Sequence, residues 1–335
     1  MVERGLFSRL YRDYRGAGYA ERLKVSYLYR GEEKVEDTHA LNLCWGASAS
    51  NFGDGLSPLV VHLLSGKKLA GKNNDSNLAS PKLLALGSIL ERAADGDLVW
   101  GAGARGEKLS CSELDIYAVR GPLTREWLLN QGVHCPEVYG DPAILMPWLY
   151  QPNTKEEFDV GLIQHYADKS VSKPLDSNIS VNRIDVTSEP LNVIDEICKC
   201  KTIISSSLHG VVLAEAYGIP ACWLRPADHL WNYPEPSMKY EDYFLGTGRD
   251  PQPCRFDGEL NIAEAVRFAA TVEKPQFQQQ ELLASFPFLR EGIRELDDLK
   301  RFSISFADVN VSLSGFAGFV AGRVVKKLKA GLGGH

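Results

Sequence analysis

TIISSSLHGVVLAEAYGIPACWLR, residues 202–225, is the stretch that decides the fold. Its first residues, Thr202–Ile204, are apolar and β-branched, which is typical of a buried strand. Three serines follow where a helix is expected to begin, and residues 208–217 have helical spacing. A glycine and a proline end this helix, and residues 221–224 return as a second strand. The stretch therefore predicts a β-α-β unit of a parallel sheet.

A lone histidine, His209, stands at the start of the predicted helix, directly after Ser207 and Leu208. Open α/β sheets bind ligands at the carboxyl ends of their strands, and the amides of a helix N-terminus favour an anion. A histidine at a helix start can equally be a capping or core residue. The local sequence thus predicts either an anion site at this turn or a structural imidazole.

Composition limits the classes of function. The chain has 335 residues, enough for two α/β domains, and its net charge of −6 argues against a nucleic-acid-binding protein. Its seven cysteines are scattered and odd in number, which indicates reduced thiols in a cytoplasm. We find no apolar region of a signal peptide and no run of eighteen apolar residues, so we expect a cytoplasmic protein without a membrane span.

Two series of alternating strands and helices follow each other along the chain. A polar, proline-containing linker at residues 147–157 separates them. This rhythm predicts an α/β protein with two Rossmann-like doubly wound domains that face a cleft. The expected parts are an N-terminal arm at residues 1–35, a first domain at 36–150, a second domain at 155–302 and a tail at 303–335. In the second domain we expect a strand at 184–186 and helices at 191–198, 239–244, 260–271 and 279–302.

Polar residues follow several strands of the first predicted domain. Asn51 and Asp54 lie in a glycine-containing loop before a helix expected from Pro58, where they can bind sugar hydroxyls or cap that helix. Arg105 ends a glycine-rich turn after the strand at 97–100. These residues are candidate acceptor contacts.

Arg120 stands at the end of the strand predicted at 115–119, just before a helix that starts with Gly-Pro. A cation beside a helix N-terminus suits a phosphate or carboxylate, although a surface ion pair is the alternative. Asp141 and His165 follow two further strands. They can act as a base or as acceptor contacts, or serve as a turn former and a structural imidazole.

The C-terminal tail is basic and amphipathic. Residues 315–330 carry one arginine and three lysines without an acid, and their apolar residues fall close to one helical face. This pattern is typical of a segment that lies on an anionic membrane surface, and also of a helix that packs on its own domain or on a partner.

Seven segments, taken in order, resemble the polysaccharide pyruvyl transferase family. They are NFGDGLSPLVVHLLSG, GSILERAADGDLVWGAG, DIYAVRGPLTREWL, VYGDPAILMP, DVGLIQHY, SSSLHGVVLAEAYGIPACWLR and KYEDYFLGTGR. The resemblance covers roughly residues 40–250. It implies a GT-B-like pair of domains and the transfer of pyruvate, as a ketal, from phosphoenolpyruvate to a sugar of an exopolysaccharide, capsule or other cell-envelope glycan.

The same resemblance implies roles for single residues. Arg120, Leu208 and His209 match the family's donor-site arginine and leucine–histidine pair, and His209 would be the acid or base of the reaction. Many members have an arginine just before that pair, where this chain has Ser207. A second cation for the donor would then come from Arg225 or from one of two further residues. These are Arg249 and Arg105.

No cofactor or metal is expected, because phosphoenolpyruvate enters as a co-substrate. The expected partners are this donor and a sugar acceptor, either free or linked to polyprenyl diphosphate, with no nucleic acid. Peripheral contact with the inner face of the membrane would use the basic tail. Two alternatives stay open, namely a GT-B glycosyltransferase that uses a nucleotide sugar, and a non-catalytic glycan-binding relative.

Overall fold

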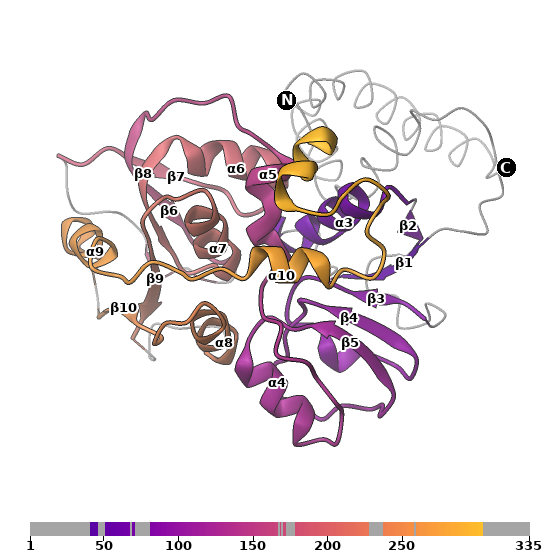
Figure 1. The fold of residues 1–335 in the computed structure, drawn as a ribbon. Helices are drawn as coiled ribbons and strands as arrows, with labels where there is room; N and C mark the ends of the chain where they lie inside the picture. The colour runs from indigo at the N-terminus through magenta and orange to yellow at the C-terminus, as the bar shows by residue number, and fades with distance from the viewer. Residues whose placement is uncertain are drawn as a thin grey trace, which may run out of the picture. The chain divides into compact units, whose positions relative to one another are not determined.

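The structure is a computed structural model, and the described part of the chain belongs to one unit, Asp37–Ser303 (Figure 1). The described residues are 41–45, 51–67, 69–70, 81–166, 168, 170–171, 178–227, 237–257 and 259–303. The predicted N-terminal arm and the basic tail, including residues 315–330, lie outside them.

Two five-stranded sheets organise this unit, and every pairing between their strands is parallel. The first sheet has the order β2-β1-β3-β4-β5. Its strands are β1 (Leu41–Cys44), β2 (Leu69–Ala70), β3 (Leu83–Leu84), β4 (Asp97–Trp100) and β5 (Leu114–Ala118). The second has the order β10-β9-β8-β6-β7. Its strands are β6 (Phe158–Ile163), β7 (Val181–Arg183), β8 (Cys200–Ser205), β9 (Ala221–Pro226) and β10 (Pro253–Phe256).

Helices cover both faces of the second sheet (Figure 1). Alternate residues of a strand point to opposite faces. Ile204, Cys222 and Leu224 therefore pack with Ile262 and Ala265 of α9 (Ile262–Ala269). The opposite face carries α6 (Pro190–Cys198) and α7 (Leu208–Ala216). This doubly wound arrangement confirms the predicted β-α-β unit and the Rossmann-like α/β class.

Trp100 shows how the first sheet is covered. Val99 and its neighbours pack on one face with η1 (Leu90–Arg92) and α4 (Pro122–Leu129). Trp100 points the other way: its indole nitrogen donates to the carbonyl of Leu282 at 2.9 Å, and its ring lies 4.5 Å from that of Phe286. Both partners belong to or follow α10 (Gln279–Ala284). Helix α10 and Phe286 after it thus contact the first sheet, although the sequence predicts them to be part of the second domain.

The remaining elements connect the two sheets. They are α3 (Phe52–Ser65), η2 (Pro142–Leu145), α5 (Met146–Leu149), α8 (Met238–Gly246) and η3 (Leu296–Phe302). The hydroxyl of Tyr150 donates to Asp195 of α6 at 2.7 Å, and Tyr150 is fully buried. The start of the expected linker is therefore part of the core.

Some predicted boundaries are wrong. Helix α3 begins at Phe52 instead of Pro58, because burial along its length outweighs the low helix propensity of its glycines and proline. The strand expected at 184–186 lies three residues earlier, since burial and not strand pairing explains the apolar Ile184 and Val186. The long helix expected at 279–302 is two short ones, interrupted before Pro287.

Two other observations concern the chain as a whole. All seven cysteines are free, as the sequence predicts. In the part of the chain that the structure describes, no helix has the length and apolar character needed to cross a membrane.

Candidate functional site

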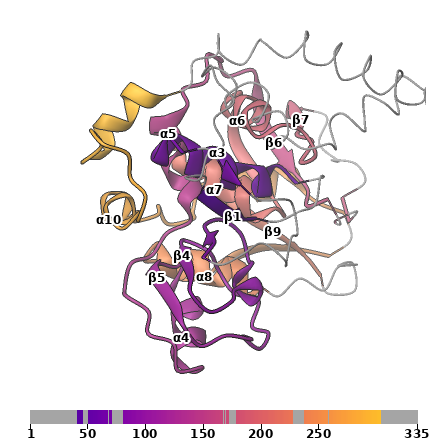
Figure 2. The ribbon, with the colours of Figure 1, turned by 90° about the vertical axis from the view of Figure 1, so that its right-hand side faces the viewer.

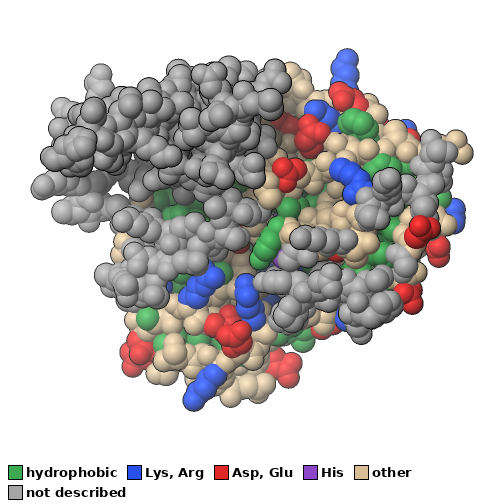
Figure 3. Space-filling view, turned by 180° about the vertical axis from the view of Figure 1, so that it is seen from behind, with side chains coloured by type: hydrophobic (Ala, Val, Ile, Leu, Met, Phe, Trp, Pro, Cys, Tyr) green, Lys and Arg blue, Asp and Glu red, His purple; other side chains and the backbone are tan. Residues whose placement is uncertain are grey.

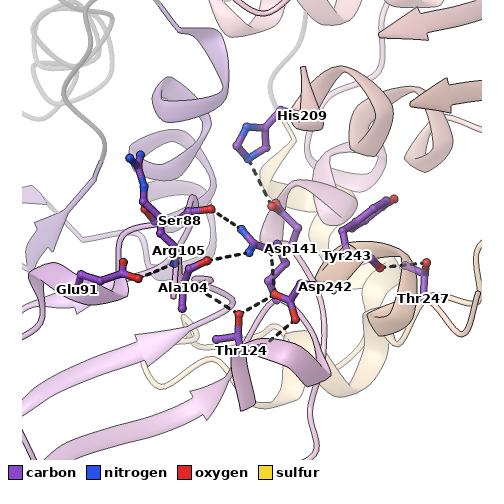
Figure 4. Close-up of polar contacts among 11 residues, drawn as sticks. Ser88, Glu91, Ala104, Arg105, Thr124, Asp141, His209, Asp242, Tyr243 and Thr247 are labelled. Carbon is purple, nitrogen blue, oxygen red and sulfur yellow. Dashed lines mark hydrogen bonds and ion pairs between the residues drawn. The ribbon is translucent and has the colours of Figure 1, made fainter. Parts of the chain in front are cut away.

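Three helix starts meet at His209. The histidine is in the first turn of α7, Asp141 is the N-cap of η2, and Gly53 is in the first turn of α3. The imidazole Nε2 lies 3.4 Å from Asp141 Oδ2 (Figure 4). On the other side of the ring, a Cβ added to Gly53 would lie only 2.1 Å from Nδ1. The ring is therefore held between the two neighbouring helix starts.

The His209–Asp141 pair is buried and has an open hydrogen-bonding capacity. The side chains are 9% and 1% exposed, yet Nε2 and Oδ2 each have no hydrogen-bond partner. The other carboxylate oxygen of Asp141 accepts from the amide of Ala143 at 3.0 Å, which fixes the carboxylate. Buried polar atoms without partners are rare in folded proteins, and a catalytic role is one of the explanations for them. An imidazole beside a carboxylate can give and take a proton.

The serines before His209 do not cap α7 in the way that the sequence predicts. Ser207 is the N-cap of α7 by position, but its side chain makes no capping hydrogen bond. The hydroxyl of Ser205 instead donates to the Ser207 carbonyl at 2.8 Å and accepts from the Ser207 amide at 3.0 Å. Leu208 is buried, consistent with a packing role. The hydroxyl of Ser205 thus bonds both backbone groups of Ser207 and closes the turn.

Asn51 and Asp54 belong to the same helix start as Gly53. The Asn51 side chain accepts from the Gly53 amide at 3.1 Å, so it caps α3. Asp54 lies in the first turn, where an acid is favoured by the helix dipole. The amide of Phe52 donates to the carbonyl of Val186 at 2.9 Å, which joins this helix start to the second sheet. The cap that the sequence placed near Pro58 is six residues earlier, because the helix itself starts earlier.

Arg120 is buried and bound on all three guanidinium nitrogens. Nε donates to Asp242 at 3.0 Å, Nη1 to the hydroxyl of Ser88 at 2.7 Å, and Nη2 to the carbonyl of Ala104 at 3.4 Å (Figure 4). A Cβ on Gly103 would lie 2.2 Å from the guanidinium carbon. Arg120 is therefore in an ion pair, but one inside the protein instead of on its surface.

The carboxylate of Asp242 occupies the position beside Arg120 where the sequence predicts the phosphate or carboxylate of a ligand. It accepts from the amide of Thr124 at 3.0 Å and from the Thr124 hydroxyl at 2.6 Å, in the first turn of α4. Helix α8 approaches so closely that a Cβ on Gly121 would lie 1.9 Å from the Asp242 carbonyl oxygen. Figures 1 and 2 show α8 beside α4. Asp242 thus binds α8 to the first sheet.

His165 follows β6 and is buried. Its backbone amide donates to the hydroxyl of Ser206 at 3.0 Å, so it lies beside the turn that leads to His209. Burial, helped by the charges of Lys239, Arg105 and His209, lowers the pKa of His165 to about 3. The imidazole is therefore neutral at physiological pH, and its neighbours place it in the same cluster as His209.

Arg105 and Lys239 bring further positive charge to this region. The Nε of Arg105 donates to the carbonyl of Ser88 at 3.1 Å, and the side chain is exposed. Burial, with repulsion from Arg120 and Arg105, lowers the pKa of Lys239 to about 7. Figure 3 shows Lys and Arg side chains beside a histidine near the middle of one face.

Two other arginines are candidates for the second donor cation. Arg249 forms a bidentate ion pair with Glu215, at 2.8 and 2.9 Å, and both side chains are buried. This cation is already neutralised by Glu215 of α7, so it does not supply the missing charge. Arg225 is the second-last residue of β9, and its guanidinium lies 5.8 Å from the centroid of the Trp223 ring.

Sequence reasoning missed the parts of the site that come from α8 and from Gly53. Asp242 and Lys239 lie in the segment KYEDYFLGTGR, which carries a resemblance but no local pattern of a site. Asp242 is 122 positions from Arg120, so no spacing argument could pair them. A glycine beside a capping asparagine was the available signal for Gly53. In the described ranges, no three His, Cys, Asp or Glu side chains are grouped as a metal site would require.

Comparisons with known proteins identify the family of the chain. The sequence model of the polysaccharide pyruvyl transferase family matches residues 51–229, more than half of the chain and the part that contains His209, Asp141 and Arg120. The succinoglycan biosynthesis protein ExoV of Rhizobium meliloti (strain 1021) is 29% identical over 251 residues, 71% of this chain and 74% of that protein. An uncharacterized protein of Acanthamoeba polyphaga mimivirus is 27% identical over 210 residues, 60% of this chain and 72% of that protein.

Proposed function

Because the chain belongs to the polysaccharide pyruvyl transferase family, we propose that it transfers pyruvate from phosphoenolpyruvate to two hydroxyls of one sugar. The product is a pyruvate ketal, and phosphate is released. One observation carries this proposal: a buried imidazole and a buried carboxylate face each other, with Nε2 of His209 3.4 Å from Oδ2 of Asp141, where the starts of α3, η2 and α7 meet.

The reaction needs an acid and a base at one place. A proton added to the methylene carbon of phosphoenolpyruvate makes the neighbouring carbon electrophilic. The first sugar hydroxyl forms a bond to that carbon, phosphate leaves with the electrons of the broken carbon–oxygen bond, and the second hydroxyl closes the ketal. One hydroxyl proton replaces the proton given to the methylene, and the other leaves with phosphate or solvent. His209 is suited to deliver and accept these protons, with Asp141 stabilising the protonated ring.

The donor carries a phosphate and a carboxylate, so its site needs cations and helix amides. The starts of α3 and α7 supply amides on both sides of His209. Arg120 is the proposed donor arginine: Nε is held by Asp242, and Nη1 and Nη2 each keep one N–H beyond their bonds to Ser88 and Ala104. Ser207 and Leu208 border this site, with Arg225 as a further donor contact.

On the acceptor side we propose Asn51, Asp54, Arg105 and His165, which lie after strands of both sheets. The acceptor would be a sugar of a cell-surface polysaccharide or of its lipid-linked precursor. The name of the Rhizobium meliloti relative, a succinoglycan biosynthesis protein, supports a polysaccharide acceptor. The two Rossmann-like halves, 36–150 and 155–302, would face each other in the GT-B manner, in a cytoplasmic or peripheral protein.

The test is direct. The purified full-length chain is incubated with phosphoenolpyruvate and a panel of free and lipid-linked pyranosides, and both phosphate release and ketal-linked pyruvate are measured. We expect both products in equal amounts from the wild type, and neither from His209→Ala, which should retain a cooperative thermal melt. Stabilisation by UDP or GDP but not by phosphoenolpyruvate, together with no turnover on the whole panel, would refute the proposal.

A further inference from the structure

We propose that the ring of Tyr166 stacks on a C–H face of the acceptor sugar and so selects a pyranose whose hydroxyls are equatorial. This inference rests on the proposed function, because it names the kind of sugar that the same site takes. Tyr166 is not among the residues proposed above for the acceptor. Its position on the solvent side of a buried histidine gives it this role.

The first step is the place of Tyr166 in the fold. The residue follows β6 at the carboxyl end of the second sheet, the edge at which open α/β sheets bind ligands. Its side chain is 40% exposed, and among the described residues Leu129 is the one other large hydrophobic side chain that is exposed. Single exposed apolar side chains are common on proteins. The role of Tyr166 therefore depends on what holds it and what lies beside it.

The second step is the rigidity of the turn that carries the ring. The amide of His165 donates to the hydroxyl of Ser206 at 3.0 Å, and the same hydroxyl donates to the carboxylate of Asp168. The Asp168 amide in turn donates to the carbonyl of His165 at 2.7 Å. Residues on both sides of Tyr166 are thus bound to the turn that leads to His209. A tyrosine held in this way loses little conformational entropy when it binds a ligand.

The third step is the direction in which the ring lies. The centroids of the His165 and Tyr166 rings are 4.2 Å apart. His165 is buried and Tyr166 is exposed, so the phenol ring lies on the solvent side of the imidazole. Burial is the main cause that lowers the pKa of His165, and the charges of Lys239, Arg105 and His209 add to it. The Tyr166 ring is therefore one layer outside the cluster that contains the catalytic imidazole.

The fourth step is the chemistry of the ligand. The face of an aromatic ring is negative, and it attracts the slightly positive hydrogens of C–H bonds. In a β-glucoside all substituents are equatorial, so both faces of the pyranose carry only axial C–H bonds. An α-mannoside has one axial oxygen on each face, which interrupts the contact. The polar groups beside Tyr166, such as the exposed guanidinium of Arg105, can bind the equatorial hydroxyls at the rim of the sugar.

The test compares Tyr166→Leu and Tyr166→Phe with the wild type in the full-length protein. KM values for donor and acceptor are measured by phosphate release, with a pyranoside that the wild type turns over. We expect Tyr166→Leu to raise the acceptor KM about 10-fold, the value of one aromatic stacking contact, and to leave the donor KM unchanged. Tyr166→Phe should keep both values, because the ring face is retained. Urea midpoints show whether each variant is folded.

Saturation-transfer NMR supplies a second readout. Aromatic protons of the protein are saturated in the presence of methyl β-D-glucopyranoside or methyl α-D-mannopyranoside. Transfer to the ring C–H protons of the glucoside should be strong in the wild type and Tyr166→Phe and weak in Tyr166→Leu. The mannoside should receive less in all three. Leu129→Ala is the matched control, since Leu129 is 42% exposed at the far end of α4, and it should behave like the wild type.

The outcomes separate the two proposals. Wild-type turnover with an unchanged acceptor KM in Tyr166→Leu overturns the role of Tyr166 and leaves the proposed function standing. An equal rise of the donor KM has the same meaning, because it shows a general disturbance of the site. Equal transfer to the glucoside and the mannoside overturns the selection of equatorial hydroxyls. A wild type that turns over no pyranoside with phosphoenolpyruvate overturns both proposals.

Discussion

Gly53→Ala should disable the site while leaving the protein folded. The glycine is in the first turn of α3, and the added Cβ would lie 2.1 Å from Nδ1, 2.7 Å from Cγ and 2.9 Å from Cε1 of His209. An ordinary carbon contact is about 3.5 Å, so the overlap is about 1.4 Å. The backbone of α3 belongs to a long buried helix, so we expect the ring of His209 to move and its Nε2 to leave Asp141.

The structure sets the size of the two effects. A displacement of about 1 Å at a catalytic group costs about 100-fold in rate, which is about 2.7 kcal/mol. Overpacking costs about 1–3 kcal/mol of folding free energy, but replacing a helical glycine by alanine returns about 1 kcal/mol. The predicted loss of stability is thus about 0–2 kcal/mol, against a 100-fold loss of kcat/KM.

The assay measures initial rates of phosphate release from phosphoenolpyruvate with an active acceptor, and thermal melts are recorded for each variant. Gly161→Ala is the matched control. Its added Cβ would lie 2.5 Å from Cδ1 of Ile203 and 2.9 Å from Sγ of Cys200, which is a similar overlap away from His209. It should lower the melting temperature without lowering kcat/KM. A Gly53→Ala variant with wild-type kcat/KM would refute the assigned position of the imidazole.

Two further predictions concern buried charge. Glu215→Gln leaves the buried guanidinium of Arg249 without its bidentate partner. We expect the free energy of unfolding, measured with urea, to fall by about 3–5 kcal/mol. An unchanged urea midpoint would contradict this. His165 has a folded-state pKa of about 3, below the ordinary 6.5, so the unfolded state binds the additional proton and stability falls as pH decreases from 6.5 towards 3. His165→Asn should remove about one proton from the pH dependence of the free energy of unfolding, measured by urea unfolding at several pH values. An identical slope of unfolding free energy against pH in both proteins would show that this imidazole is not the buried neutral group.

The sequence by itself determined the parallel α/β class and the second sheet's central unit. In residues 202–225 a strand, a helix and a strand are short-range patterns, and each depends mainly on hydrophobic spacing and on Gly and Pro as terminators. The same holds for the placement of His209 and Arg120 after strands, because the turns that follow parallel strands are visible as polar interruptions of apolar runs. The strand expected before Asp141 is wrong: only an isolated bridge between Val119 and Tyr139 forms there.

The start of α3 was decided by tertiary structure. Local propensity places Gly53 and Gly55 before a helix that starts at Pro58, but nearly every residue of α3 is packed against other elements. Helical stability in proteins comes largely from such packing, so the helix begins at Phe52 and brings Gly53 against His209. The sequence could predict neither the boundary nor the contact.

Tertiary structure also decided what each charged residue does. Arg120 and Asp242 meet because α8, far along the chain, packs on the first turn of α4. Arg249, a candidate donor cation by sequence, is neutralised by Glu215 in the same way. The partner of a charge depends on contacts between distant segments, whereas strand and helix patterns depend on near neighbours. That difference is why the fold class could be predicted from the sequence, while the charge pairing of the site could not.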